Sequence, residues 1–434
     1  MSMPITYSFK KVLSLRIPRT RWWAVAVALV IAFFLFTPKS PENICIHNIT
    51  FFGVAEIPHN CDSVSMVNAL GDVPDYITGV NYWKGRPVYM LTGYVFGQML
   101  LPITKPVWQL FLNKNSAAQS YKKNFAKNFH YHVAFILINF AIVFFAARYA
   151  IFVSGLNPTH FIAIALAVAV SSIDLVEGFV FVLHTSLFNL LSAFGAVAYV
   201  GFGISAYFRS HKQTVLLGVI VGMGVLSYPV IAILAPAYLV GLAYGMWRWP
   251  DLFPNKGRCF VGAGLFVATC AAFPLAWMAL NSFVFETYTY ATATVYKQFT
   301  WPLEAYRNGE LIARSYVHFK GFLASLLHYM WVEFIFIGVI LTALAVKGRL
   351  YLQHFVRDPA LFSLLIGILG VLSFNYLQDF NQARMQMPIL ILLYTVIARV
   401  AVLSEQTKLG NGALICIGAY QLVNAALYTS LQYE

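Results

Sequence analysis

The chain has 434 residues, of which 60% are hydrophobic and only 10% are charged. Because a soluble domain normally carries about 25% charged residues, this composition excludes a soluble globular enzyme, a disordered chain and a small disulfide scaffold. The formal net charge is +13, but no basic face alternates with aromatic residues, so we exclude nucleic-acid binding. One membrane-spanning helix takes roughly 20 apolar residues, and such runs recur along the chain. We therefore predict an all-α fold, a polytopic transmembrane helical protein.

The first apolar run covers residues 22–36 and follows a basic N-terminal segment. The run ends in Thr37-Pro38-Lys39 without a small-residue cleavage site, and further apolar runs come after it. We interpret it as an uncleaved first helix whose N-terminus is cytoplasmic, in agreement with the positive-inside rule.

Counting this run, twelve apolar runs are candidates for membrane crossings. The basic gaps between them are predicted to face the cytoplasm, and alternation from these gaps places the C-terminus outside, in the periplasm. An inside start and an outside end require an odd number of crossings, so one candidate does not cross. The candidates are residues 22–36, 88–103, 131–150, 160–176, 185–207, 213–228, 230–247, 260–284, 321–346, 359–376, 385–402 and 411–430.

Run 160–176 is the weakest candidate, because it leads into polar residues that end at Asp174 and Glu177. We expect it to dip into the membrane from the outer face and return, which leaves about eleven crossings, in a range of about 10–12. If run 88–103 failed to cross instead, Asp174 would still lie outside, but the basic segment of Lys122, Lys123 and Lys127 would no longer be cytoplasmic.

The whole chain, residues 1–434, is predicted to form a single transmembrane domain with a first outer loop at 38–87 and a second outer loop at 285–320. Apolar residues at positions 64, 66, 67 and 70 of the first loop predict a short juxtamembrane helix at the membrane interface. Asp62 is expected at or near the N-cap of this helix.

Polar residues with a candidate chemical role lie at both ends of this stretch. The short helix starts at Asp62 and Ser63, and the loop ends in Arg86-Pro87-Val88-Tyr89. A purely structural interpretation exists for two of them, with Asp62 as a helix cap and Arg86 as an interfacial cation. Chemically, a carboxylate near apolar surface has a raised pKa that suits a general base. A guanidinium group holds phosphate with two parallel hydrogen bonds.

The arrangement resembles the GT-C superfamily of polytopic glycosyltransferases. In that superfamily a carboxylate of the first outer loop sits beside juxtamembrane helices and faces a polyprenyl-phosphate sugar donor. The chain departs from its oligosaccharyltransferase-like and protein-mannosyltransferase-like members, because no acidic pair accompanies Asp62 and no globular C-terminal domain follows. Three further segments resemble the pattern: the acidic residues Asp174 and Glu177, Tyr228 after a helix at the outer face, and Gln382 with Arg384 before a late helix.

The resemblance implies an enzyme of the bacterial inner membrane that works among membrane lipids. It would move a sugar from a polyprenyl-phosphate-linked donor to a glycolipid or surface-polysaccharide acceptor on the outer face. Such a donor brings its own leaving phosphate, and no nucleotide-binding loop is found in the sequence. The candidate catalytic residues are Asp62, Asp174 and Glu177, and the candidate substrate-binding residues are Arg86, Arg384, Ser63, Tyr89, Tyr228 and Gln382.

Two other functions stay open at this point, a flippase or transporter of lipid-linked oligosaccharides and a polymerase of them. A transporter is expected to show internal repeats and helices broken at the membrane midplane, and the sequence has no two-fold self-similarity. A polymerase usually carries a large late outer loop rich in Arg and His. Here the acidic residues concentrate in the first outer loop instead, which favours the transferase.

The remaining polar residues carry weaker expectations. No histidines or cysteines stand at metal-ligand spacing, so no metal site and no cofactor are predicted, although the sequence leaves open whether a divalent metal assists. Cys45 and Cys61 share the first outer loop, where a disulfide and two free thiols both remain open. Glu333 lies in an apolar run, and we predict that it makes a hydrogen bond between helices.

Overall fold

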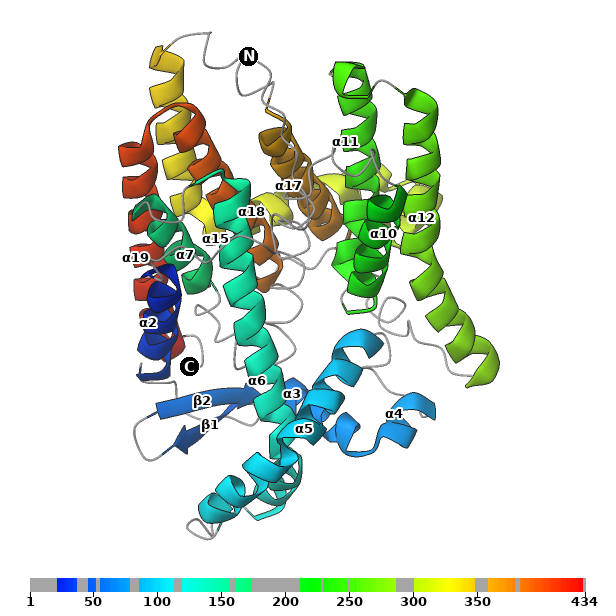
Figure 1. The fold of residues 1–434 in the computed structure, drawn as a ribbon, viewed down its shortest axis with the longest axis vertical. Helices are drawn as coiled ribbons and strands as arrows, with labels where there is room; N and C mark the ends of the chain where they lie inside the picture. Colours follow the sequence, from blue (N-terminus) through cyan, green and yellow to red (C-terminus); the bar gives the residue numbers. More distant parts are fainter. Residues whose placement is uncertain are drawn as a thin grey trace.

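The computed structural model describes residues 22–36, 46–51, 55–78, 86–112, 119–156, 161–173, 211–227, 229–248, 250–253, 255–285, 300–347, 358–378 and 383–431. These residues form a helical bundle, which confirms the predicted all-α class with one exception in the first outer loop (Figure 1). There β1 (Ile46–Phe51) pairs antiparallel with β2 (Ala55–Asn60), a hairpin that the sequence analysis did not predict.

The helices divide into a set of long helices, which form the bundle, and a set of short helices, which lie between them along the chain. The short set comprises α3 (Cys61–Gly71), α4 (Val73–Thr78), α14 (Trp301–Arg307), the 3-10 helices η2 (Pro229–Ile233) and η3 (Pro250–Leu252), and the π-helical turn η4 (Leu280–Val284). The long set comprises α2 (Trp22–Phe36), α5 (Pro87–Leu112), α6 (Gln119–Val153), α7 (Phe161–Ile173), α10 (His211–Val225), α11 (Leu234–Arg248), α12 (Lys256–Ala279), α15 (Leu311–Lys347), α17 (Pro359–Gln378), α18 (Ala383–Leu403) and α19 (Thr407–Leu431).

Several of these helices could span a membrane, as predicted. Within the described residues, four stretches are long and apolar enough to cross one: Lys127–Val153, Ile231–Arg248, Lys256–Val284 and Ala360–Gln378. Helix α15 adds a fifth if its two parts, which are bent by 78° at Met330, form one broken span. The predicted run 185–207 lies outside the described residues.

Helix α7 is enclosed by four other helices. It contacts α2, α6, α18 and α19, and Ala163, Leu166 and Val170 on it are all 0% exposed. Alanine at alternate positions keeps the helix thin, so its neighbours approach closely. Helix α7 follows α6 after a short connection and therefore begins at the end of α6 that is furthest from Lys127. The prediction that this run dips in from the side of the first outer loop is wrong.

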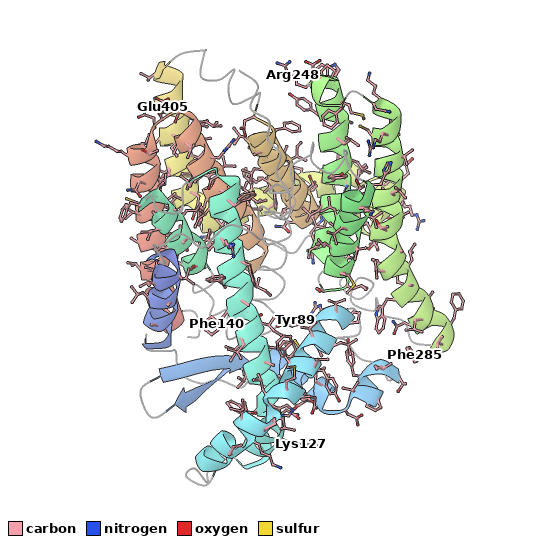
Figure 2. All side chains as sticks on the ribbon, in the orientation of Figure 1. Tyr89, Lys127, Phe140, Arg248, Phe285 and Glu405 are labelled. Atoms are coloured by element: carbon pink, nitrogen blue, oxygen red, sulfur yellow. The ribbon has the colours of Figure 1, made fainter. Side chains whose placement is uncertain are left out.

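Figure 2 labels residues at both ends of the bundle. Arg248 and Glu405, from two regions predicted to be cytoplasmic, lie at one end, and Phe285, at the start of the second outer loop, lies at the other. Lys127 lies beyond Phe285, at the end opposite Arg248. This contradicts the prediction that the segment around Lys127 shares the cytoplasmic side with Arg248.

The first outer loop confirms this placement of the start of α6. The Asn128 Nδ2 donates a hydrogen bond to the Asn68 Oδ1 of α3 at 2.9 Å, and the Asn128 side chain also packs on Gly71. The start of α6 and the first outer loop therefore lie on the same side. A helix of 35 residues is about 50 Å long, which exceeds the roughly 30 Å of a hydrocarbon core, so α6 projects past the bundle at this end.

Helix α5 packs mainly against α6. It contains Pro102 and Pro106 and is not one of the candidate spans among the described helices. It packs instead along the projecting part of α6, where Gly93 and Gly97 leave no Cβ in the way of Phe135 and Tyr131. Glycines four residues apart let two helix backbones approach closely. This packing favours the alternative in which run 88–103 does not cross, and among the described residues four stretches, or five with the bent α15, have the length and composition of a span.

This alternative gives a labelling prediction for exposed positions. In a cysteine-free variant, Lys127→Cys and Glu310→Cys are expected to react with a membrane-impermeant maleimide from the same side. Lys256→Cys and Lys408→Cys, near the other end, are expected to react only after the membrane is opened. In inverted vesicles the two sets of positions are expected to exchange, so that positions 256 and 408 react without opening. All four side chains are exposed in the structure, so access depends on the side alone. Labelling of position 127 together with position 256 would contradict this alternative.

Candidate functional site

The first outer loop folds into two short helices that pack under the bundle. Helix α3 presents one apolar face, on which Met66, Val67 and Leu70 are 0–1% exposed, and the predicted helix over 62–70 is confirmed. Because α3 begins at Cys61, Asp62 lies in its first turn rather than before it. Helix α4 follows after a turn in which the Tyr76 N–H donates to the Asp72 carbonyl at 2.9 Å.

Arg86 stands directly before α5 and is positioned by the start of that helix. Pro87 occupies the first helical position, where no backbone N–H is needed and the fixed φ of proline suits the helix. The Arg86 carbonyl accepts the first hydrogen bond of the helix, from the Met90 N–H at 3.2 Å. The Arg86 side chain is half-buried, so the protein holds part of the guanidinium inside.

Two buried tyrosines lie within electrostatic reach of Arg86. Tyr76 is 0% and Tyr89 is 3% exposed, and the charge of Arg86 acts on both phenols. Burial raises the pKa of Tyr76, and the positive charge of Arg86 opposes that rise. Because an ordinary phenol has a pKa of about 10, both groups are neutral at pH 7 and leave the charge of Arg86 in place.

Helix α6 contributes a buried amide to the same place. The Tyr89 hydroxyl donates to the Asn139 Oδ1 at 3.4 Å, and the Tyr89 ring packs on Phe135 with centroids 4.4 Å apart. Asn139 is 0% exposed. We name Tyr76, Arg86, Tyr89 and Asn139 the Arg86 cluster. A guanidinium offers five N–H donors in a planar fork, so the chemistry of this cluster suits an anion such as a phosphate.

The structure brings together two of the predicted site residues, Arg86 and Tyr89. Asp62 and Ser63 lie in the first turn of α3, a helix that contacts α5, and Arg384 is the second residue of α18, but the side chains of these three lie outside the described part of the chain. The other four predicted site residues, Asp174, Glu177, Tyr228 and Gln382, also lie outside the described residues.

Sequence reasoning missed the two other members of the Arg86 cluster. Asn139 carried a readable signal, because it is an amide within the apolar stretch 133–147, where a polar side chain is expensive and usually has a partner. Tyr76 carried none, since a tyrosine in a loop at the membrane interface is common without any role in binding.

A second polar network lies deep in the bundle. The Tyr394 hydroxyl and the Gln421 Nε2 both donate to the Glu333 Oε1, at 2.8 Å and 2.9 Å. Glu333 is 0% exposed and stands three residues after the bend at Met330. The network joins α15, α18 and α19, which confirms the predicted hydrogen bond between helices.

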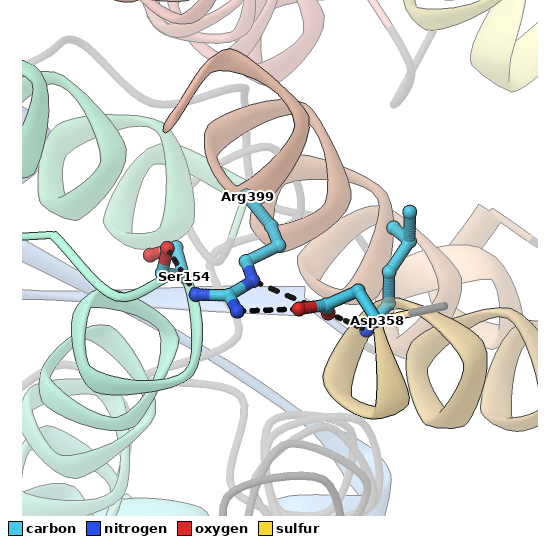
Figure 3. A network of polar contacts seen from close by, with 4 residues as sticks. Ser154, Asp358 and Arg399 are labelled. Carbon is cyan, nitrogen blue, oxygen red and sulfur yellow. Dashed lines mark hydrogen bonds and ion pairs between the residues drawn. The ribbon is translucent and has the colours of Figure 1, made fainter. Parts of the chain in front are cut away.

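A third network joins Ser154 after α6, Asp358 before α17 and Arg399 of α18 (Figure 3). The Arg399 Nη2 lies 2.6 Å from the Asp358 Oδ2, and its Nη1 donates to the Ser154 carbonyl at 3.4 Å. Gly155 follows with a φ of 71°, and a Cβ there would collide with the Arg399 guanidinium. Sequence analysis did not single out these residues.

No group of three or more His, Cys, Asp or Glu side chains converges among the described residues in a way that could hold a metal ion. The predicted site is thus described in part, as the Arg86 cluster on helices that α3 contacts. Comparison of the chain with protein-family models, with curated proteins and with solved structures finds no match.

Proposed function

We propose that the chain is an integral-membrane glycosyltransferase of the GT-C type. It takes a sugar from a polyprenyl-phosphate-linked donor and passes it to a glycolipid or surface polysaccharide on the outer face of the bacterial inner membrane. Asp62 acts as the general base toward the acceptor hydroxyl, and Arg86 holds the donor phosphate. Asp174, Glu177 and Arg384 are proposed to complete the site from the same side.

The Arg86 cluster is the observation that carries this proposal. A half-buried guanidinium flanked by two buried, neutral phenols stands where the first outer loop meets α5 and α6. A fixed cation at this place fits the leaving phosphate of a lipid-linked donor, whose charge grows as the sugar departs. Helix α3, whose first turn contains Asp62, packs against α6 and α5, which supports a base and a phosphate clamp in one site.

The proposal keeps eleven crossings but changes which runs cross. Removing α5 and restoring α7 leaves eleven of the twelve predicted runs, so the N-terminus stays cytoplasmic and the C-terminus periplasmic. In this arrangement α7 leads toward the outer face, where Asp174 follows directly after Ile173. The proposal therefore keeps Asp174 and Glu177 on the side of the donor.

One observation favours a second candidate function, the flippase for lipid-linked oligosaccharides. Helix α15 is broken at Met330 and carries the buried carboxyl group of Glu333 just after the break. Broken helices and buried carboxylates are typical of transporters. Because Glu333 already accepts two hydrogen bonds from neighbouring helices, a structural role explains it equally well, and the transferase remains the better supported function.

The intact surface glycan of a deletion strain, compared by mass with that of its parent, tests the proposal. A glycan that lacks single sugar residues supports transfer. Loss of the whole polymer indicates a polymerase, and accumulation of a cytoplasmic lipid-linked intermediate indicates a flippase. Either of the last two results would overturn the transferase.

The same strain allows a matched comparison of two arginines. Arg86→Lys keeps the charge but loses the planar fork, so restoration of the glycan is expected to fall about tenfold or more. Arg314→Lys is the control, because Arg314 pairs with Glu310 at an exposed position, 2.9 Å apart. If both variants restore the glycan equally, the guanidinium of Arg86 does not hold the donor phosphate through its planar fork.

A further inference from the structure

Helix α15 changes direction at Met330. Its first part, Leu311–His328, is bent by 78° from its second part, Met330–Thr342. The second part belongs to the bundle, because Glu333 on it is hydrogen-bonded to side chains of α18 and α19. The first part therefore runs across the bundle rather than along it.

Two hydrogen bonds tie this first part, and α14 before it, to one end of α17. The Trp301 Nε1 of α14 donates to the Leu377 carbonyl at 3.0 Å. The Tyr376 hydroxyl donates to the Ser315 carbonyl at 3.1 Å. Leu377 and Tyr376 both lie in the last turn of α17, so α14 and the first part of α15 are held where that helix ends.

The length of α17 relates this end to the membrane. The helix has 20 residues and is about 30 Å long, which equals the thickness of a hydrocarbon core. Asp358, directly before its first residue, pairs with Arg399 at the end of the bundle that is predicted to be cytoplasmic. The last turn of α17 therefore stands at the outer boundary of the core, and Leu311–His328 lies at that boundary with it.

One side of Leu311–His328 is an exposed apolar stripe. Its five members recur at intervals of three or four residues, which places them on one face of the helix, and their exposed fractions lie between 43% and 87%. The opposite side packs on the protein, with Phe322 7% exposed and its ring 5.9 Å from that of Tyr376. The stripe consists of Ile312, Tyr316, Phe319, Leu323 and Leu327.

We propose that Leu311–His328 lies flat in the outer interface of the membrane, with this stripe covered by the acyl chains of the outer-leaflet phospholipids. An amphipathic helix in this position buries its apolar face at the boundary between headgroups and acyl chains. Lys320 follows Tyr316 by four residues and borders the stripe, and both Lys320 and Arg307 are exposed. Their positive charges complement the headgroup phosphates at this level.

The two other environments suit this helix poorly. In the hydrocarbon core, the charges of Arg314 and Lys320 would be costly, because charged side chains are rarely tolerated there. In water, a continuous stripe of five large apolar side chains would be an unusual surface for a folded protein. At the interface both faces are satisfied, and the exposed rings of Tyr306 and Tyr316 are of the kind that is enriched there.

The placement also defines where α15 crosses the membrane. The part from Met330 to Lys347 covers about 27 Å, which is close to the thickness of the core, so the crossing predicted over residues 321–346 begins at Met330. This assignment does not depend on sugar transfer, since it follows from the bend, the contacts with α17 and the stripe.

Depth measurements on the full chain test the proposal. Single cysteines in a cysteine-free variant carry a nitroxide label, and the protein is placed in nanodiscs of phosphatidylethanolamine and phosphatidylglycerol. Collision of the label with oxygen and with a water-soluble nickel chelate gives its depth. The labelled variants are Ile312→Cys, Phe319→Cys and Leu327→Cys, and the matched set at the same spacing on the candidate span Lys256–Val284 is Phe260→Cys, Val267→Cys and Leu275→Cys, which are also exposed positions.

On α12, the label at position 267 is expected about 10 Å deeper than that at position 260, because seven residues of a crossing helix separate them. On α15, all three labels are expected at one depth, roughly 5–10 Å into the boundary between headgroups and acyl chains. A difference between positions 312 and 319 as large as that on α12 would mean that Leu311–His328 crosses the membrane, and would overturn the proposal.

Two further outcomes also contradict it. Ready collision of all three α15 labels with the nickel chelate would place the stripe in water. Protection from both oxygen and the chelate, together with spin–spin broadening, would place the stripe against a second copy of the chain.

Discussion

Asp62→Asn is expected to lower sugar transfer at least about 100-fold, the usual contribution of a general base. The substitution keeps the size of the side chain and its ability to accept a hydrogen bond at the start of α3, so the helix should still form. What it removes is the basicity needed to take the proton of the acceptor hydroxyl. The measurement is the rate of polyprenyl-phosphate release by the purified protein in nanodiscs, with a saturating acceptor.

Asp72→Asn is the matched control for this substitution. Asp72 lies in the same outer loop, eleven positions from Cys61, and its side chain is exposed at the turn between α3 and α4. Its replacement is expected to leave the rate within about twofold, because exposed surface substitutions seldom matter. If the Asp62→Asn protein is well folded and transfers sugar at the parental rate, Asp62 is not the general base and serves only the structure of α3. Equal loss in both variants would point to the net charge of the loop instead.

Local patterns predicted the local structure well. The apolar positions 66, 67 and 70 form the buried face of α3, as a short amphipathic pattern requires. Arg86 and Tyr89 are close to each other because they are three positions apart at the start of α5. Asn139 lies fifty residues beyond its partner Tyr89, and no pattern in a single sequence links residues so far apart.

The topology failed at one step, and the reason is physical. Charge counting placed the segment around Lys127 inside because it is basic, but the rule describes a bias over many loops rather than a property of each. Hydropathy alone does not separate a span from an apolar helix packed on protein, since both have the same composition. Gly93 and Gly97 mark the close packing of α5 on α6, and the same spacing recurs in Gly218 and Gly222, where α10 packs against Thr269 and Cys270 of α12. The spacing therefore identifies close helix packing and does not show whether a helix crosses the membrane.

Arg399→Met is expected to lower the free energy of unfolding by about 3–5 kcal/mol, because it leaves the carboxylate of Asp358 buried without its counter-charge. The side chains of the pair are only 11% and 9% exposed. The guanidinium also caps the last turn of α6 through the Ser154 carbonyl, and Asp358 caps α17 by accepting from the Leu361 N–H at 2.7 Å. Loss of the cation therefore loosens α6, α17 and α18 together.

Gel filtration in detergent after a series of heating steps measures this loss as a fall in the monodisperse fraction. Arg314→Met is the control, since its pair with Glu310 is exposed on both sides and is worth about 0–1 kcal/mol. Adding Asp358→Asn to Arg399→Met should restore part of the stability, because asparagine keeps the cap of α17 and removes the uncompensated charge. If the double variant is less stable than Arg399→Met alone, the carboxylate is not the source of the loss, and the cap on α6 must carry it.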